Sequence, residues 1–415
     1  MNRVRWIEIK CVGKITSPVA AIVNSVCKSV FYLACRYTNT PYRISFRLER
    51  GTWINQLSSN TPMKGKNLTL KAITPCLLLI CLTLAVSAQR ASDAGRVYFI
   101  KFENDSYTVN SINPDGSNEQ FVTESSDGIF SPSPDGNQIL FLRARNPDAA
   151  FEDRQHDIYL MGSNGSDLVR VTNSGENYSP TWSPSGESIA FIHEQENEYS
   201  VEFLSRDQPD TVESLFHTTS QIGNLDWSPD ESQLVFTVCD TQLNCDLGTI
   251  HIVSRESTIL TSSFQPNVLS ATWSNALNLI GFIAYEQTDI LKSNIYTIDV
   301  VTGETINVTN FDADYRSIAW SAENDFIVFA SNQQGNNWEI YRIKRDTGEQ
   351  INLTNNPNLQ DGIYGLDVSH IGDVIAYSTG PIEGGFEIYT MSLDGTDTEQ
   401  ITIGGMHKLN PVWTD

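Results

Sequence analysis

The sequence predicts an all-β protein, a β-propeller of seven four-stranded blades, on three observations. A Trp-Ser segment recurs about every 45 residues, short runs of alternating apolar and polar residues separate its copies, and the body of the chain keeps no 3.6-residue apolar period. Four short strands per unit, repeated around a ring, are the arithmetic of a propeller. Helices are therefore expected to be nearly absent.

The first recurring segment carries a tryptophan at a constant place. Its copies read TWSPSGESIAF, DWSPDESQLVF, TWSNALNLIGF and AWSAENDFIVF, and their tryptophans are Trp182, Trp227, Trp273 and Trp320, spaced by 45, 46 and 47 residues. Trp413 follows 93 residues later, which is two units, and Val368 and Pro132 take the tryptophan place in two further copies. In a propeller this tryptophan fills the space between blades and Ser-Pro-Asp-Gly forms the turn to the next strand. These residues are interpreted as core.

Two further elements recur between the tryptophan segments. One reads DIYLMGS, TIHIVSR, NIYTIDV, EIYRIKR and EIYTMSL, and the other reads RVT, ILT, NVT, NLT and QIT. Each is a short apolar alternation bounded by Asp, Asn, Gly, Ser or Pro, which is typical of strands and turns.

The ends of the repeat array predict how the ring closes. RVYFIKF at 96–102 matches the second strand of a unit, and NPVWTD at 410–415 matches the first strand alone. The C-terminal strand is therefore expected to complete the blade begun by residues 96–123, which removes the exposed edges and gives seven blades. Six blades with one degenerate unit is the alternative.

A secretory signal peptide is predicted at 63–88, within MKGKNLTLKAITPCLLLICLTLAVSAQR. Three lysines follow Met63, an apolar run extends from Ile73 to Val86, and small residues precede a cleavage site after Ala88. The run is shorter than a transmembrane helix of about 20 residues, so cleavage is favoured over a retained signal anchor. The propeller domain is then 89–415, outside the membrane once the signal is removed.

Residues 1–62 do not fit in front of an export signal, which acts from the start of a chain. We interpret them as upstream sequence translated in error, with Met63 as the true start. A genuine cytoplasmic or targeting extension is the alternative.

Charge and cysteine usage support export. Residues 89–415 contain 15 basic and 48 acidic residues, a charge of −33, which argues against nucleic acid as a partner. Five of the seven cysteines precede residue 89, and Cys239 and Cys245 form a close pair in the body. A lone pair in an exported protein predicts one disulfide rather than a metal knuckle. The expected location is the periplasm, the cell envelope or the extracellular space.

At this point the repeat resembles a known family. The Pro-x-Trp-Ser-Pro-Asp-Gly and Glu-Ile-Tyr-x-Met patterns are similar to the TolB-type, WD-repeat-like β-propeller repeat, and the resemblance covers about 96–414. TolB carries an α/β domain before its propeller, whereas the predicted cleavage site lies within ten residues of these repeats. Peptidases with similar propellers carry a C-terminal α/β-hydrolase domain, and we find no G-x-S-x-G motif here.

Binding is expected on one face of the ring, called the loop face below. It carries the loops between the second and third strands of each blade and the loops that precede each first strand, and such loops on a rigid scaffold are where function concentrates. The insertion 143–156 and the cysteine hairpin 239–247 are its most distinctive segments. The partner-binding candidates are Phe151, Glu152, Asp153, Glu194, Glu196 and Glu198.

The mouth of the central channel supplies a second set of candidates. Residues that open the inner strands are expected there, and its polar or aromatic members are Tyr178, Asn224, Arg316, Tyr364 and Asn410. Arg316 either grips a ligand carboxylate or, as we favour, pairs with Asp312 or Asp314. His156 and His193 lie in this face but lack a third ligand, so no metal site is predicted. Clustered carboxylates leave calcium as a weak alternative.

These features favour an exported, non-catalytic propeller that binds a protein or glycan through the loop face. The acids of that face are interpreted as a solvated surface that keeps the protein soluble, with a basic partner as the alternative. We find no catalytic motif. The alternative is a propeller enzyme, a lyase or hydrolase, with its site at the channel mouth.

Overall fold

The structure is a computed structural model in which the chain divides into two compact units, Met1–Ala88 and Gln89–Asp415. It describes four strands within the first 58 residues and then residues 95–414. The gaps in the second range are 105, 148, 150–154, 210, 263, 265–266, 276–277, 287–288, 310–312, 334–337, 355–361, 370, 372 and 382–383. The predicted signal peptide 63–88 lies outside the described residues.

The first unit contains a four-stranded antiparallel sheet in the order β1-β2-β3-β4. Its strands are Arg5–Glu8, Tyr32–Arg36, Arg43–Arg47 and Trp53–Ser58. The sequence of residues 1–62 shows no clear strand period. Each strand is only four to six residues long, which is too short for an alternation to stand out.

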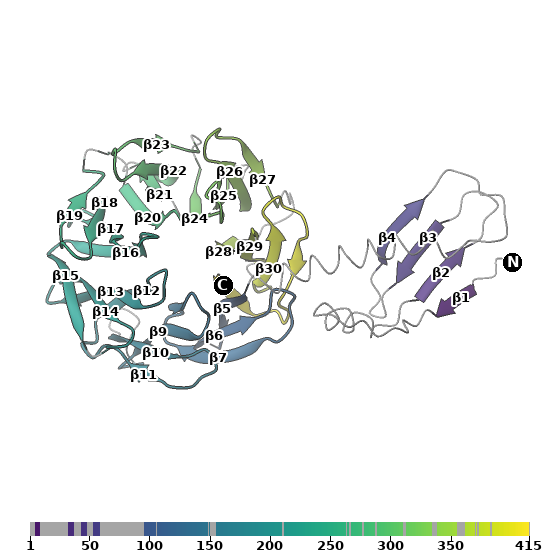
Figure 1. Cartoon of the computed structure of the whole chain (residues 1–415), viewed down its shortest axis with the longest axis horizontal. Helices are drawn as coiled ribbons and strands as arrows, with labels where there is room; N and C mark the ends of the chain where they lie inside the picture. The colour runs from purple at the N-terminus through teal and green to yellow at the C-terminus, as the bar shows by residue number, and fades with distance from the viewer. Residues whose placement is uncertain are drawn as a thin grey trace. The chain divides into compact units, whose positions relative to one another are not determined.

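The described strands of the second unit form seven four-stranded antiparallel sheets, and Figure 1 shows them arranged as blades around a ring. Blade I contains β32 (His407–Thr414), β5 (Arg96–Glu103), β6 (Ser106–Ile112) and β7 (Gln120–Ser125); blade II contains β8 (Phe130–Pro132), β9 (Gln138–Ala144), β10 (His156–Gly162) and β11 (Val169–Arg170). Blade III contains β12 (Asn177–Trp182), β13 (Ser188–Gln195), β14 (Glu198–Ser205) and β15 (Val212–Thr218); blade IV contains β16 (Gln221–Trp227), β17 (Gln233–Cys239), β18 (Cys245–His251) and β19 (Ser257–Ile259).

The remaining blades follow the same order from the inner to the outer strand. Blade V contains β20 (Asn267–Trp273), β21 (Leu279–Glu286), β22 (Asp289–Asp299) and β23 (Thr305–Asn307). Blade VI contains β24 (Tyr315–Trp320), β25 (Phe326–Ser331), β26 (Glu339–Lys344) and β27 (Gln350–Asn352); blade VII contains β28 (Gly362–Val368), β29 (Val374–Gly380), β30 (Glu387–Ser392) and β31 (Glu399–Gln400). The all-β, seven-bladed prediction is confirmed, and the described residues contain no helix.

Blade I closes the ring as the sequence predicts. β32 pairs antiparallel with β5, so that Val412 lies opposite Tyr98 and Trp413 opposite Val97. The backbone amide of Arg96 also donates to Oγ1 of Thr414 at 3.2 Å. This pairing gives β5, the first strand of the propeller, a neighbour on each side.

The repeat tryptophans lie in the core between blades. Trp182, Trp227, Trp273, Trp320 and Trp413 are each no more than 6% exposed. The indole of Trp182 donates to the carbonyl oxygen of Ser131 in blade II at 3.1 Å, and that of Trp320 to Thr272 in blade V at 3.4 Å. The indoles of Trp182 and Trp320 therefore bond blade III to blade II and blade VI to blade V as well as filling space.

The Ser-Pro-Asp-Gly turn is stabilised by its own side chains. In blade II the Ser133 hydroxyl donates to Asp135 at 2.5 Å and accepts from the Gln138 amide at 3.0 Å, while Asp135 accepts from the Asn137 amide at 3.0 Å. Gly136 follows with a φ of 64°, which favours glycine. Because the turn is closed internally, this face of the ring offers tight, short connections.

Candidate functional site

A repeated irregularity shapes the central channel. The inner strand of every blade except II shifts register by a β-bulge, and the residue at the bulge has a left-handed φ at Ser179, Asn224, Ser317, Gly365 and Asn410. Bulges turn backbone polar groups away from the sheet ladder. A cavity of about 330 Å³ lies against these bulges, and because five inner strands form its wall it lies on the ring axis.

Asn224 and Asn410, two of the channel-mouth candidates, line this cavity. Asn224 uses both ends of its amide on blade V, since Nδ2 donates to the Ala271 carbonyl at 2.9 Å and Oδ1 accepts from the Ala271 amide at 2.7 Å. Asn410 is exposed and lies so close to Gly365 that a Cβ there would be 2.8 Å from the Asn410 Cα. Asn224 is thus committed to joining blades, whereas Asn410 presents its side chain to solvent.

Tyr178 forms a compact hydrogen-bonded group with Glu194. Its hydroxyl donates to Oε2 of Glu194, and the Tyr199 hydroxyl donates to Oε1 at 3.1 Å. Burial, and next the hydrogen bond to this carboxylate, raise the pKa of Tyr178 well above its usual value. Glu194 therefore holds two tyrosines and is not a free rim acid.

Arg316 pairs with Asp314 at 3.1 Å, one of the two carboxylates expected. Its guanidinium also lies 4.2 Å from the ring centroid of Trp338, a cation–π arrangement. The fifth mouth candidate, Tyr364, is 37% exposed and packs against Phe386, with ring centroids 4.4 Å apart. These two residues offer a cation and an aromatic face at the rim, beyond the described wall of the axial cavity.

The β13–β14 hairpin of blade III presents two acids to solvent. Gln195 lies opposite Glu198, and the two turn residues Glu196 and Asn197 have φ angles of 54° and 66°. Such a turn with both central φ values positive matches the twist of the strands and makes the hairpin rigid. Glu196 and Glu198 are exposed. The other three partner-binding candidates, Phe151, Glu152 and Asp153, lie outside the described residues.

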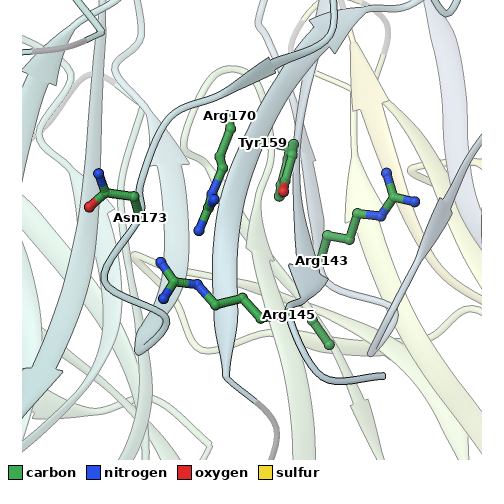
Figure 2. A pocket seen from close by; sticks show the side chains of 6 residues that line it. Arg143, Arg145, Tyr159, Arg170 and Asn173 are labelled. Atoms are coloured by element: carbon green, nitrogen blue, oxygen red, sulfur yellow. The ribbon is translucent and has the colours of Figure 1, made fainter. Parts of the chain in front are cut away.

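Blade II carries an arginine-lined groove of about 670 Å³, shown in Figure 2. Of its lining residues, Tyr159, Arg170 and Asn173 were not singled out from the sequence. The only signal was the position of Arg143 and Arg145 at the start of the long insertion.

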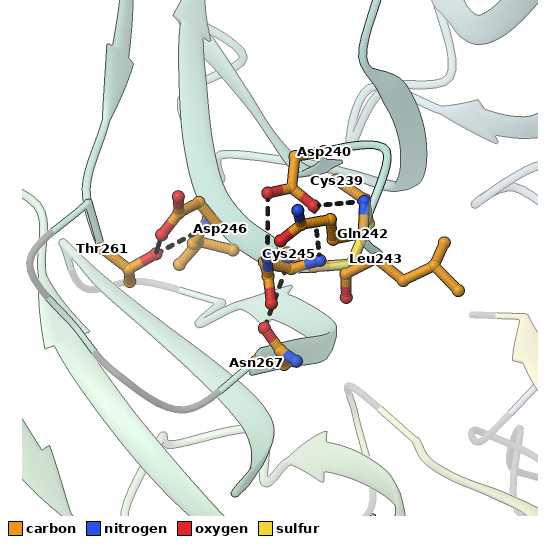
Figure 3. Close-up of a disulfide and its surroundings, with 10 residues drawn as sticks. Cys239, Asp240, Gln242, Leu243, Cys245, Asp246, Thr261 and Asn267 are labelled. Carbon is orange, nitrogen blue, oxygen red and sulfur yellow. Dashed lines mark hydrogen bonds between the residues drawn. A yellow bond between two sulfur atoms is a disulfide. The ribbon is translucent and has the colours of Figure 1, made fainter. Parts of the chain in front are cut away.

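The cysteine pair of blade IV forms the predicted disulfide. Cys239 ends β17, Cys245 begins β18, and the two lie opposite each other with Cα atoms 4.0 Å apart (Figure 3). Asp240 closes the loop between them, since Oδ1 accepts from the amides of Gln242 at 2.8 Å and Asn244 at 2.9 Å. The side-chain amide of Asn244, which donates to Oδ2 at 2.9 Å, and next the backbone amides lower the pKa of Asp240. The hairpin is thus held both covalently and by hydrogen bonds.

Four acids and one asparagine in the third strands have a structural role that sequence reasoning missed. In five blades an Asp, Glu or Asn of the third strand accepts a hydrogen bond from a threonine hydroxyl fifteen residues later. The pairs are Asp157–Thr172, Asp246–Thr261, Asn294–Thr309, Glu339–Thr354 and Glu387–Thr402. The same hydroxyl accepts the next backbone amide of the third strand, as from Leu247 to Thr261 at 2.8 Å. The constant spacing between the Glu-Ile-Tyr-type and Asn-Leu-Thr-type elements was the available signal.

The loop-face histidines are also engaged. His156 pairs through Nε2 with Asp127, and His193 contacts the Glu176 carbonyl at 3.0 Å and the Ser174 hydroxyl at 3.2 Å through Nδ1. A proton on Nδ1 that is donated to a carbonyl leaves this nitrogen unable to accept from Ser174, so the contact is not a nucleophile–base pair. Among the described residues, no group of three His, Cys, Asp or Glu side chains is placed to hold a metal ion.

Comparisons with known proteins extend the fold assignment. No family model and no curated protein matches the chain. Among solved structures, TolB from Acinetobacter baumannii is 14% identical with a TM-score of 0.52, over 98% of this chain and 88% of that one. The β-propeller domain of the trilobed protease from Pyrococcus furiosus is 13% identical with a TM-score of 0.57, over 74% and 92%. That propeller has an open velcro topology, whereas here β32 completes blade I.

An oligogalacturonate lyase in complex with manganese is similar at the same level, 12% identical with a TM-score of 0.52 over 74% of this chain and 85% of that one. The described residues contain no helix that is long and apolar enough to cross a membrane. Because these solved structures are only 12–14% identical to the chain, their similarity shows the fold alone. The solved structures thus support the TolB-like β-propeller that the repeats predict.

Proposed function

We propose that this chain is an exported, non-catalytic β-propeller that binds a protein or glycan partner through its loop face. The observation that carries the proposal is the pair of rigid hairpins on adjacent blades: β13–β14 with exposed Glu196 and Glu198, and β17–β18 with the Cys239–Cys245 cross-link. Preorganised loops lose little conformational entropy on binding. They therefore suit a recognition surface.

The acids of the first hairpin favour a basic partner. Rim charges act mainly on the rate of association and its salt dependence, because they steer encounter more than they add affinity. We expect the double variant Glu196→Lys/Glu198→Lys to slow association with a partner captured from the exported fraction and to flatten its salt dependence. Glu194 is left intact, since it holds Tyr178 and Tyr199.

Surface plasmon resonance across a salt series measures this effect. The matched control is Glu187→Lys/Glu323→Lys, which changes charge equally at two exposed positions in the turns that follow the tryptophan segments, on the opposite face. If the control slows association and the hairpin variant does not, the partner meets the turn face and the proposal is wrong. In the insertion 143–156, we predict that Phe151→Ala speeds dissociation, because aromatic side chains often anchor an interface.

Export is part of the same proposal. The charge–apolar–cleavage layout of 63–88 supports it, and the expected first residue of the exported protein is Gln89. N-terminal sequencing of protein from the exported fraction tests this point. A start at Met1, or an intact 73–88 segment, would contradict it.

The enzyme alternative places a lyase or hydrolase site at the channel mouth. The axial cavity with the exposed Asn410 side chain at its wall favours testing it, and one structural neighbour is a lyase. Incubation of the purified protein with polygalacturonate and Mn²⁺ would release unsaturated oligosaccharides if the chain acts in that way. Product release that Asn410→Ala abolishes would replace the binding proposal.

A further inference from the structure

The arginine-lined groove of blade II is an unusual feature in a strongly acidic domain. Its lining residues are Arg143, Ala144, Arg145, Tyr159, Arg170 and Asn173, and no carboxylate lines it among the described residues. Three of the 15 basic residues of the −33 body thus meet in one groove. Its volume of about 670 Å³ lies in the range of small-molecule sites, which is about 300–1,000 Å³.

A buried carboxylate fixes two of the arginines. Asp157 is fully buried and accepts from Nε of Arg145 at 2.6 Å, from Nη2 of Arg145 at 3.3 Å and from Nη2 of Arg170. It also accepts from the Gly175 amide at 3.1 Å and the Thr172 hydroxyl at 3.3 Å. With its oxygens occupied, Asp157 orients the guanidinium groups but neutralises only one of their two charges.

The guanidinium nitrogens that do not bond Asp157 face the groove. Nη1 of Arg145 and Nη1 of Arg170 bond no described residue, and the side chains remain 31% and 42% exposed. Gly175, with a φ of 91°, leaves room for Arg145, since a Cβ there would lie 3.2 Å from Nη1. Figure 2 shows both guanidinium groups on the same side of the groove as Asn173. The remaining guanidinium nitrogens of Arg145 and Arg170, together with the side-chain amide of Asn173, can bind one oxyanion.

Arg143 supplies a second cationic end. Its exposed side chain starts on β9 beside Tyr159, with the guanidinium carbon 6.0 Å from the ring centroid, and it has no carboxylate partner among the described residues. Figure 2 shows it pointing to the other side of Tyr159 from Arg145. The groove therefore has a cation at each end and an aromatic ring between them.

We infer that this groove binds a small organic dianion: Arg145, Arg170 and Asn173 hold one oxyanion group, Arg143 holds the other, and the carbon chain lies along Tyr159. The site does not depend on the proposed partner-binding hairpins, which belong to blades III and IV. Failure of one proposal would leave the other standing.

Isothermal titration calorimetry of residues 89–415, secreted as the whole exported protein, tests the inference. The probes are dicarboxylates from succinate to adipate, 3-phosphoglycerate, inorganic phosphate as a single oxyanion, and adipamide as the neutral counterpart of adipate. We expect saturable one-to-one binding of a dicarboxylate or of 3-phosphoglycerate, and no binding of adipamide. Which of the two binds more tightly identifies the second group as carboxylate or phosphate.

The variants avoid Arg145 and Arg170, because their loss would leave Asp157 buried without its partners. Arg143→Gln and Asn173→Ala should each weaken dianion binding about tenfold, the value of one charge-assisted hydrogen bond. Arg143→Gln should leave phosphate binding unchanged. The control Arg255→Gln removes an exposed arginine paired with Glu213 in blade IV and should have no effect. Binding of adipamide, wild-type affinity in both groove variants, or an equal loss in the control would overturn the site.

Discussion

Trp413, near the C-terminus, lies opposite Val97, the second residue of the first propeller strand, and its backbone amide donates to Asp367 of blade VII at 2.9 Å. One residue thus joins the last blade to the first and the end of the propeller to its beginning. A ring that is closed by a single strand depends on that strand more than on any internal one.

Deletion of residues 409–415 should therefore destabilise the whole propeller. It removes most of β32 and leaves β5 as an exposed edge, and the loss of Trp413 alone costs about 3–5 kcal/mol of unfolding free energy. We expect a large drop in melting temperature or aggregation, measured by calorimetry. Trp413→Phe, which keeps the strand and most of the buried volume, should lose much less. A truncated protein that melts within about a degree or two of the full one would contradict strand closure.

The Cys239–Cys245 disulfide should contribute little to global stability. The loop that it closes is short, so the chain-entropy model gives at most about 2–3 kcal/mol, and the hydrogen bonds of Asp240 hold the same hairpin. Reduction of purified protein should leave the strand content by circular dichroism unchanged and lower the urea midpoint only slightly. Cys239→Ser/Cys245→Ser is the matched variant. Two free thiols in protein from the exported fraction would mean that the bridge does not form.

The sequence predicted the fold well because the repeat encodes it in local terms. The spacing of Trp182 and Trp320 gives the blade length, and NPVWTD gives the closing strand. Contacts between side chains of different segments were harder to predict from the sequence. Glu194 is indistinguishable from Glu196 in the sequence, yet Glu194 bonds two tyrosines and Glu196 projects into solvent, because Glu194 lies in strand β13 whereas Glu196 lies in the turn that follows it.

Some contacts of the candidate site could be predicted from a pattern in the sequence, and others depend on the folded structure. The fifteen-residue spacing between the third-strand acid and the threonine is a sequence signal that a register comparison of the repeats would have found. The Asn224–Ala271 bridge is not, because it depends on a bulge that rotates Asn224 toward the next blade. The blade II groove likewise depends on Asp157 drawing together arginines from β11 and from the loop after β9.

Thr261, the threonine of an acid–threonine pair, should contribute more to the stability of the fold than its exposed neighbour Thr258. Thr261 is 2% exposed, donates to Asp246 at 2.8 Å and accepts from the Leu247 amide at 2.8 Å. Thr261→Val keeps the shape but leaves both partners without this bond, which costs about 1–3 kcal/mol. Thr258→Val, at an exposed position of β19, is the control and should change the urea midpoint little. Equal midpoints for the two variants would show that the pair is dispensable.

Glu387 and Lys408 should give blade VII an acid-sensitive contact. The Lys408 ammonium is 2% exposed and donates to Oε2 of Glu387 at 2.8 Å. Burial alone would raise the pKa of Glu387, but hydrogen bonds from Lys408, Thr402 and the Gly405 amide outweigh it and lower the pKa below its usual 4.5. A carboxylate whose pKa falls on folding stabilises the protein above its unfolded pKa, and that contribution is lost as the pH falls through the folded value.

Glu387→Gln removes both the titration and the charge that compensates Lys408. At pH 7 we expect a loss of unfolding free energy of up to about 3–5 kcal/mol, because the ammonium is left buried without its counter-ion. The difference between wild type and variant should stay constant down to about pH 5 and shrink below it, as the wild-type carboxylate becomes protonated. Urea unfolding at a series of pH values measures this difference, and Glu399→Gln, an exposed carboxylate on the neighbouring strand β31, is the control. A difference that persists unchanged to pH 3 would mean that the Glu387 charge does not stabilise the fold, and that packing alone accounts for the loss.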